Sequence, residues 1–190
     1  MKQWDVEYWK QKQAMETGQA AEGADSLAAL PSEEEEELLK ATKKAMSLLQ
    51  HMDRTEWELR SKLQRSEFSA EAIEAAIAYV QSYHYIDDER YARRFVEIYR
   101  SSRSMQRIKQ DLLKRGVADQ YITLAIEEFD GDDSGALQKA LEKCLRGKTS
   151  LTYDEQQKVM AKLYRRGFRS QDIRRQIDLW KERQEISAKE

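Results

Sequence analysis

Large apolar residues recur with the same internal spacing in three separate stretches of the chain. In each stretch the steps are four, five, five and four residues. The three sets are Leu59, Leu63, Phe68, Ile73 and Ile77; Ile108, Leu112, Val117, Ile122 and Ile126; and Val159, Leu163, Phe168, Ile173 and Ile177. Leu59 and Ile108 lie 49 residues apart, and Ile108 and Val159 lie 51 apart, a period typical of helical repeat proteins. Because one such unit cannot bury its apolar face alone, the pattern predicts three like modules packed in tandem.

A glycine marks the end of the second helix in two of the three repeats. Glycine takes the left-handed backbone conformation that ends many helices more readily than any other residue, and Gly116 and Gly167 stand at this place. Leu112 and Val117 occupy the two positions that touch each other in a Schellman motif. Repeat one has Glu67 at the same place, so we expect strain there and a gain in stability when glycine replaces it.

The starts of several helices carry capping residues. Three hydroxyl residues are followed three positions later by a glutamate, which is the capping-box pattern. The pairs are Ser32 with Glu35, Thr55 with Glu58, and Thr152 with Glu155. No alternating apolar run bounded by hairpin turns is found, so we expect no β-strands.

These patterns predict an all-α protein in which three tandem three-helix repeats form an elongated, curved array. We expect the repeats at residues 32–86, 87–132 and 133–183, with a C-terminal tail at residues 184–190. Residues 1–31 are expected to form a flexible or loosely docked extension, because residues 11–30 hold few large apolar side chains. Trp4, Tyr8 and Trp9 would share one face of a short helix that folds back onto the body, with docking to a partner as the alternative.

The composition agrees with solvated helices. Charged residues make up 36% of the 190 residues, the mean hydropathy is -0.88, and there are 7 Gly and 1 Pro. We see no signal-peptide pattern and no run of about 18 apolar residues, so we expect a cytoplasmic protein without membrane contact. Cys144 is the only cysteine, which excludes an internal disulfide and favours a packing role. No long heptad seam is present, so we expect a monomer.

Candidates for catalysis and metal binding are few. Asp87, Asp88 and Glu89 could be read as catalytic carboxylates, but their place before an apolar stripe favours helix capping. His51 and His84 are the only histidines, and with one cysteine they form no metal-ligand spacing. The sequence also lacks a glycine-rich phosphate loop and a Gly-x-Ser-x-Gly elbow. We therefore expect a protein that is not an enzyme, with no catalytic residue, metal site or cofactor.

Basic residues concentrate in the second and third repeats. Residues 1–80 carry a net charge of -6 and residues 81–190 a net charge of +4. Such side chains bind acidic protein or phosphate, although a solvated helix surface is the alternative. The candidate partner-binding residues are Arg93, Arg94, Arg100, Arg103, Arg107, Lys109, Lys114, Arg115, Lys162, Arg165, Arg166, Arg169 and Arg174.

Two segments of the chain resemble the RecX family of bacterial recombination regulators. They are RTEWELRSKL at residues 54–63 and the more specific YIDDERYARRFV at residues 85–96. Together with Arg100, Arg107-Ile108, Leu112 and the stop at residues 114–117, the resemblance covers about residues 45–180. Ser104-Met105 replaces the Gly-Pro that many relatives carry, and residues 1–31 match nothing in the family.

The resemblance implies three-helix repeats and a regulatory role in recombination, DNA repair and the SOS response. Such a protein binds the RecA filament on single-stranded DNA along its groove and inhibits the ATPase, strand-exchange and coprotease activities of RecA. DNA would then be contacted weakly or through RecA. The alternative is a helical repeat module that binds single-stranded nucleic acid directly and independently of RecA, which the same basic residues would support.

Overall fold

The computed structural model describes residues 32–187, and these form nine α-helices and no strand. The helices are α2 (Glu33–His51), α3 (Glu56–Gln64), α4 (Ala70–Ser82), α5 (Asp88–Tyr99), α6 (Met105–Leu113), α7 (Asp119–Glu128), α8 (Ser134–Leu145), α9 (Tyr153–Arg165) and α10 (Ser170–Ser187). The all-α prediction is confirmed for this part of the chain. The predictions for the linker and for Trp4, Tyr8 and Trp9 fall outside the described residues.

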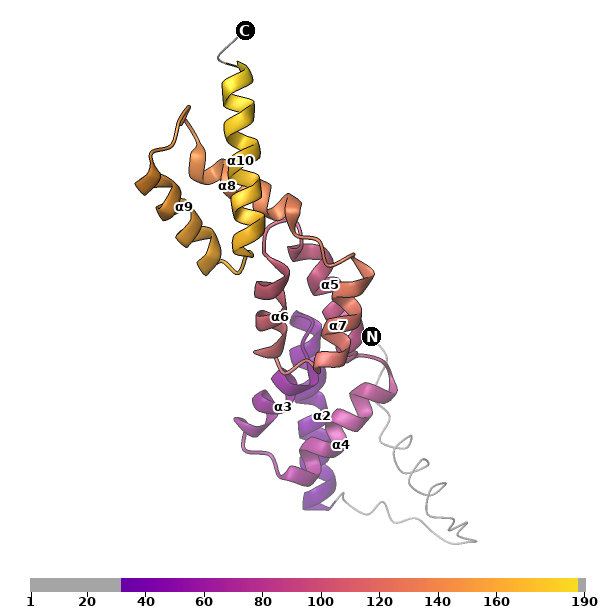
Figure 1. The fold of residues 1–190 in the computed structure, drawn as a ribbon. Helices are drawn as coiled ribbons and strands as arrows, with labels where there is room; N and C mark the ends of the chain where they lie inside the picture. The colour runs from indigo at the N-terminus through magenta and orange to yellow at the C-terminus, as the bar shows by residue number, and fades with distance from the viewer. Residues whose placement is uncertain (1–31, 188–190) are drawn as a thin grey trace, which may run out of the picture. The chain divides into compact units, whose positions relative to one another are not determined.

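The nine helices form three groups of three, each with a hydrophobic core of its own (Figure 1). Helices α2 to α4 surround the first core, α5 to α7 the second and α8 to α10 the third. Almost all of the apolar residues that recur in the sequence are buried in these cores, while Phe68 and Ile126 are partly buried and pack against them. The three predicted three-helix repeats are therefore confirmed.

One apolar residue just after α2 does not contribute to the first core. Met52 continues the apolar spacing of α2, but its side chain is exposed. The helix ends at His51, so Met52 no longer follows the helical period that would turn it inward.

The second helices of repeats two and three end in the predicted Schellman motifs. Gly116 and Gly167 have φ angles of 76° and 89°. The Val117 N–H donates to the Leu112 carbonyl over 3.2 Å, and the Gly116 N–H donates to the Leu113 carbonyl over 3.0 Å. Glu67 also takes the left-handed conformation, with φ at 62°, as the alignment of the repeats predicts.

The first repeat contacts the second through a buried hydroxyl. Thr55, the N-cap of α3, accepts a hydrogen bond from the Glu58 N–H over 3.2 Å and donates one to the Arg115 carbonyl over 2.5 Å. Thr55 is fully buried. We call this double hydrogen bond a junction latch, because one oxygen both starts a helix and binds the next repeat.

The second repeat contacts the third through an equivalent latch. Ser104, the N-cap of α6, accepts from the Arg107 N–H over 3.2 Å and donates to the Arg166 carbonyl over 2.7 Å. Ser104 is also fully buried. A glycine at this position would remove the hydroxyl and with it this contact between repeats.

Each latch is accompanied by an aspartate from the start of the following repeat, Asp88 as the first residue of α5 and Asp133 as the N-cap of α8. The Glu56 N–H donates to Asp88 over 3.0 Å, and the Met105 N–H donates to Asp133 over 3.1 Å. Burial raises the pKa of both carboxyl groups above the ordinary value for aspartate. The two junctions thus share one hydrogen-bonding plan.

One of the predicted capping boxes is incomplete in the structure. At α9, Thr152 and Glu155 exchange both bonds of the box. At α3, Thr55 accepts the bond from the Glu58 N–H, but the Glu58 carboxylate pairs with Arg115 of repeat two at 2.6 Å. The prediction of a full box at Thr55 was wrong, because the Glu58 carboxylate binds the Arg115 guanidinium of the next repeat and not the backbone at the helix start.

Replacement of Glu67 by glycine should stabilise the protein. The left-handed conformation costs a non-glycine residue about 1 kcal/mol, and glycine removes that cost. We expect a higher midpoint of thermal unfolding for Glu67→Gly than for the parent protein. The control is Glu67→Ala, which removes the charge but keeps a Cβ; an equal gain in the alanine variant would contradict the conformational explanation.

Replacement of Gly116 by alanine should destabilise the protein by more than backbone strain alone. A Cβ at Gly116 would overlap the Cβ and Cγ of Trp57 in repeat one. Strain and overlap together should cost about 2 to 4 kcal/mol. Gly147→Ala is the matched control, since Gly147 has φ at 75° but no atom near its missing Cβ. Equal losses of unfolding free energy in denaturant titrations of the two variants would show that overlap with Trp57 does not add to the backbone strain.

Candidate partner-binding surface

Six of the candidate basic residues surround one hollow of about 640 Å³, which we call the basic hollow. They are contributed by repeats two and three and are Arg103, Arg107, Lys114, Arg115, Arg165 and Arg166. The wall also contains Glu58, Phe95, Ser102 and Asp111. Six cations therefore face two carboxylates, and the hollow favours an anionic ligand.

The ends of α6 and α9 bring four of these cations to the hollow. In both repeats two basic residues directly precede the glycine of the Schellman motif, Lys114-Arg115 before Gly116 and Arg165-Arg166 before Gly167. The junction latches bind the carbonyls of Arg115 and Arg166. The same hydrogen bonds that join the repeats thus fix the backbone from which these side chains extend.

Asp111 holds two further arginines in place. Its carboxylate pairs with Arg103 at 2.8 Å and with Arg107 at 3.1 Å, and its side chain is only 14% exposed. The Arg103 guanidinium also lies over the Tyr99 ring, 3.8 Å from its centroid. These two arginines are preorganised, because ring contact and ion pairing limit their rotamers.

The remaining cations of the hollow differ in how far they are neutralised. Arg115 pairs with Glu58 at 2.6 Å. The Arg166 guanidinium donates to the Ser102 carbonyl over 3.3 Å, and Arg165 donates to the Ala161 carbonyl over 3.3 Å. Among residues 32–187, Lys114, Arg165 and Arg166 have no carboxylate within ion-pair distance. These three carry the uncompensated charge.

The other candidate residues lie elsewhere. Arg93 pairs with Glu89 and Glu128, and Arg94 pairs with Asp53, all on the exposed surface. Arg100 lies over the Phe129 ring at 4.7 Å. Exposed pairs of this kind contribute little free energy, and they leave these arginines less available to a partner.

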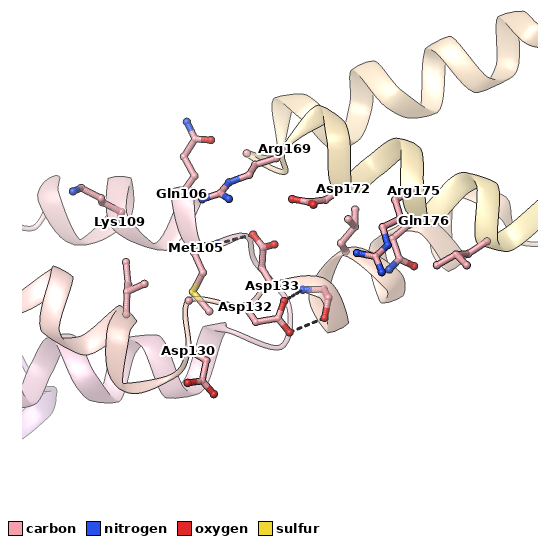
Figure 2. Close-up of a pocket in the computed structure, with 16 residues that line it drawn as sticks. Met105, Gln106, Lys109, Asp130, Asp132, Asp133, Arg169, Asp172, Arg175 and Gln176 are labelled. Atoms are coloured by element: carbon pink, nitrogen blue, oxygen red, sulfur yellow. Dashed lines mark hydrogen bonds between the residues drawn. The ribbon is translucent and has the colours of Figure 1, made fainter.

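Two more candidates, Lys109 and Arg169, line a separate hollow of about 820 Å³ (Figure 2). Its wall mixes these cations and Arg175 with four aspartates. The aspartates are Asp130, Asp132, Asp133 and Asp172. Figure 2 shows the hydrogen bonds of Asp133 with Met105 and of Asp132 with Ser134. Because charges of both signs alternate around it, this hollow has no preference for an anion.

Lys162 and Arg174 lie on exposed surface and line neither hollow. The structure thus gathers six of the thirteen candidates and disperses the others. Sequence reasoning missed the two carboxylates of the basic hollow. Asp111 follows Arg107 by four residues, a spacing that places the two side chains on one helix face and could have indicated the pair. Nothing in the sequence links Glu58 to Arg115.

The acidic run before α5 has a structural role. Asp87 is the N-cap of that helix and accepts a hydrogen bond from the Arg90 N–H over 2.8 Å, as predicted. Within residues 32–187, no three His, Cys, Asp or Glu side chains are grouped so that they could hold a metal ion. None of the helices described is long and apolar enough to cross a membrane. Cys144 is partly buried against the third core.

Family models match all three repeats in order. The model of the first three-helix domain of RecX matches residues 41–79, that of the second domain matches residues 87–126, and that of the third matches residues 132–177. These matches cover more than half of the chain.

Curated relatives carry the name Regulatory protein RecX. The relative from Trichlorobacter lovleyi is 35% identical over 136 residues, which is 68% of this chain and 88% of that protein. The relative from Clostridium acetobutylicum is 27% identical over 129 residues, and there the match spans only 60% of the relative. Both names are those of regulatory proteins and not of enzymes.

Solved structures share the fold. The crystal structure of RecX from Lactobacillus salivarius gives a TM-score of 0.66 at 22% identity, covering 76% of this chain and 97% of that one. A second crystal structure of regulatory protein RecX gives 0.69 at 20% identity, covering 88% and 87%. With three successive RecX domains in one chain and a relative that is 35% identical, the chain belongs to the RecX family of regulatory proteins.

Proposed function

We propose that this protein binds the RecA nucleoprotein filament along its groove and inhibits the ATPase, strand-exchange and coprotease activities of RecA. The family resemblance supplies the partner, and the basic hollow is the observation that supports a binding surface for it. In this proposal the protein acts as a monomer in the cytoplasm and reaches single-stranded DNA weakly or through RecA. It has no catalytic step of its own.

The hollow suits a partner with acidic surface. Its cations come from two successive repeats, so one partner can contact both repeats at once. Contacts that one chain makes simultaneously add in free energy, because the second contact is intramolecular once the first has formed. A filament presents the same surface again at each subunit, and a protein bound across neighbouring subunits would oppose their relative motion.

Reversal of two unpaired charges tests the role of the hollow. Lys114→Glu combined with Arg165→Glu should raise the concentration needed for half inhibition of RecA ATPase by about tenfold or more, since each loss of 1.4 kcal/mol is tenfold. The measurement is a titration of RecA filaments at fixed ATP and ionic strength. Lys162→Glu combined with Arg174→Glu is the matched control, because it changes the net charge equally outside both hollows. Unchanged inhibition by the Lys114/Arg165 variant would remove the hollow from the proposal.

Direct binding of nucleic acid is distinguished from inhibition of RecA by the protein concentration that each effect requires. If RecA is the partner, the protein slows ATP hydrolysis at concentrations far below those at which it retains bare single-stranded DNA. If the two concentrations coincide and both rise equally with salt, the protein acts through the strand alone. That result would contradict the proposed dependence on RecA.

A further inference from the structure

The two junctions between repeats share a latch but differ in the side chains around it. At the first junction the second and third residues of α3 are Trp57 and Glu58. At the second junction the equivalent residues of α6 are Gln106 and Arg107. The backbone hydrogen bonds are alike, so the difference in chemistry comes from these side chains.

The charged side chains at the first junction pair with each other. Glu58 pairs with Arg115 at 2.6 Å, and the pair joins repeat one to repeat two. Trp57 lies against Gly116, where it occupies the space that a Cβ would need. The charges of Glu58 and Arg115 are thus paired with each other, while the Trp57 side chain remains 53% exposed.

The second junction has the opposite charge at the same place. Arg107 replaces the glutamate, so Arg166, which is equivalent to Arg115, has no carboxylate partner from α6 at this position and donates only to the Ser102 carbonyl. Gln106 replaces the tryptophan and leaves a hollow of about 150 Å³. We call it the junction hollow; its walls are Gln106, Arg107, Gln110, Tyr164, Arg165, Arg166 and Gly167.

An exposed aromatic ring stands at the rim of the junction hollow. Tyr164 is 64% exposed, although it lies at the end of α9 beside three guanidinium groups. Leu113 occupies the equivalent position in repeat two. The second junction thus has a flat ring where the first has an aliphatic side chain.

We propose that the junction hollow is a subsite for one nucleotide of a single-stranded nucleic acid. The base stacks on the Tyr164 ring, the Gln106 and Gln110 amides face the base edge, and the phosphate is bound by Arg107 and Arg166. Every base has a π-face, so the subsite is tolerant of sequence. The binding does not require RecA, and the inference stands or falls separately from the proposed inhibition.

The chemistry of the hollow favours a nucleotide over an acidic peptide. A peptide carboxylate would use the arginines but would leave the ring and both amides without a role. A nucleotide uses all three kinds of group, since aromatic rings bind bases and guanidinium groups bind phosphates in single-strand sites. Arg103, Lys114 and Arg115 of the adjoining basic hollow extend the cationic surface on which the strand continues.

Binding of a fluorescent oligothymidylate to the full chain, followed by anisotropy at low salt without RecA, tests the subsite. Tyr164→Ala should weaken binding roughly fivefold to a hundredfold, the range for loss of one stacked base. Tyr164→Phe should bind like the parent, because the ring is kept. Leu113→Ala is the matched control at the equivalent position and should change nothing.

A second variant rebuilds the second junction on the plan of the first. Gln106→Trp combined with Arg107→Glu supplies a carboxylate for Arg166 and fills the hollow, and the first junction shows that this backbone accepts such side chains. We expect an unchanged thermal midpoint and loss of oligonucleotide binding by tenfold or more. A midpoint lowered by several degrees would instead show that the two junctions are not interchangeable and would remove the comparison on which the inference rests.

Three results would overturn the inference. Parent-like affinity of Tyr164→Ala would exclude stacking, and equal weakening in Tyr164→Phe would assign the effect to the hydroxyl. Equally tight binding of a polyglutamate peptide that is insensitive to Tyr164→Ala would identify an acidic protein as the ligand. If Tyr164→Ala still inhibits RecA ATPase while binding the oligonucleotide weakly, the ring is shown to serve strand binding and not inhibition, although the two hollows share Arg107, Arg165 and Arg166.

Discussion

A buried hydroxyl group at the start of a helix is the contact on which the arrangement of the repeats depends. Each repeat has its own core, so the cores alone do not specify how one repeat lies against the next. Thr55 and Ser104 supply that information, because each oxygen accepts the bond that caps its helix and donates a bond to the following repeat. Because Thr55 and Ser104 are fully buried, a hydroxyl left without its acceptor would cost about 1 to 3 kcal/mol, so the docking position is well defined.

The latch also connects fold to function. The carbonyls it binds belong to Arg115 and Arg166, the residues whose side chains enter the basic hollow. The glycines that follow them allow the close approach of the preceding repeat, and at Gly167 a Cβ would lie 2.6 Å from the Ser104 oxygen. The same contacts therefore dock the repeats and position the cations. Glu67, at the equivalent position of repeat one, carries a side chain in the same left-handed conformation.

Much of the fold could be predicted because it follows from local rules. The spacing of Leu59, Ile108 and Val159 with their partners identified the repeats, and the glycines identified the helix ends, since a left-handed residue has few alternatives to glycine. The site was predicted less well. Sequence reasoning named every cation of the basic hollow but also seven residues that lie elsewhere, because a basic residue on a helix surface gives no signal of what it faces across a turn.

The sequence by itself determined the three helical repeats and the excess of positive charge in the second half. These properties depend on residues close together along the chain. Only the tertiary structure decided that Glu58 leaves its capping box to neutralise Arg115 while Arg107 leaves Arg166 without such a partner. In both cases the two residues are some 60 positions apart in the chain. They come close together only after the latch has fixed one repeat against the next.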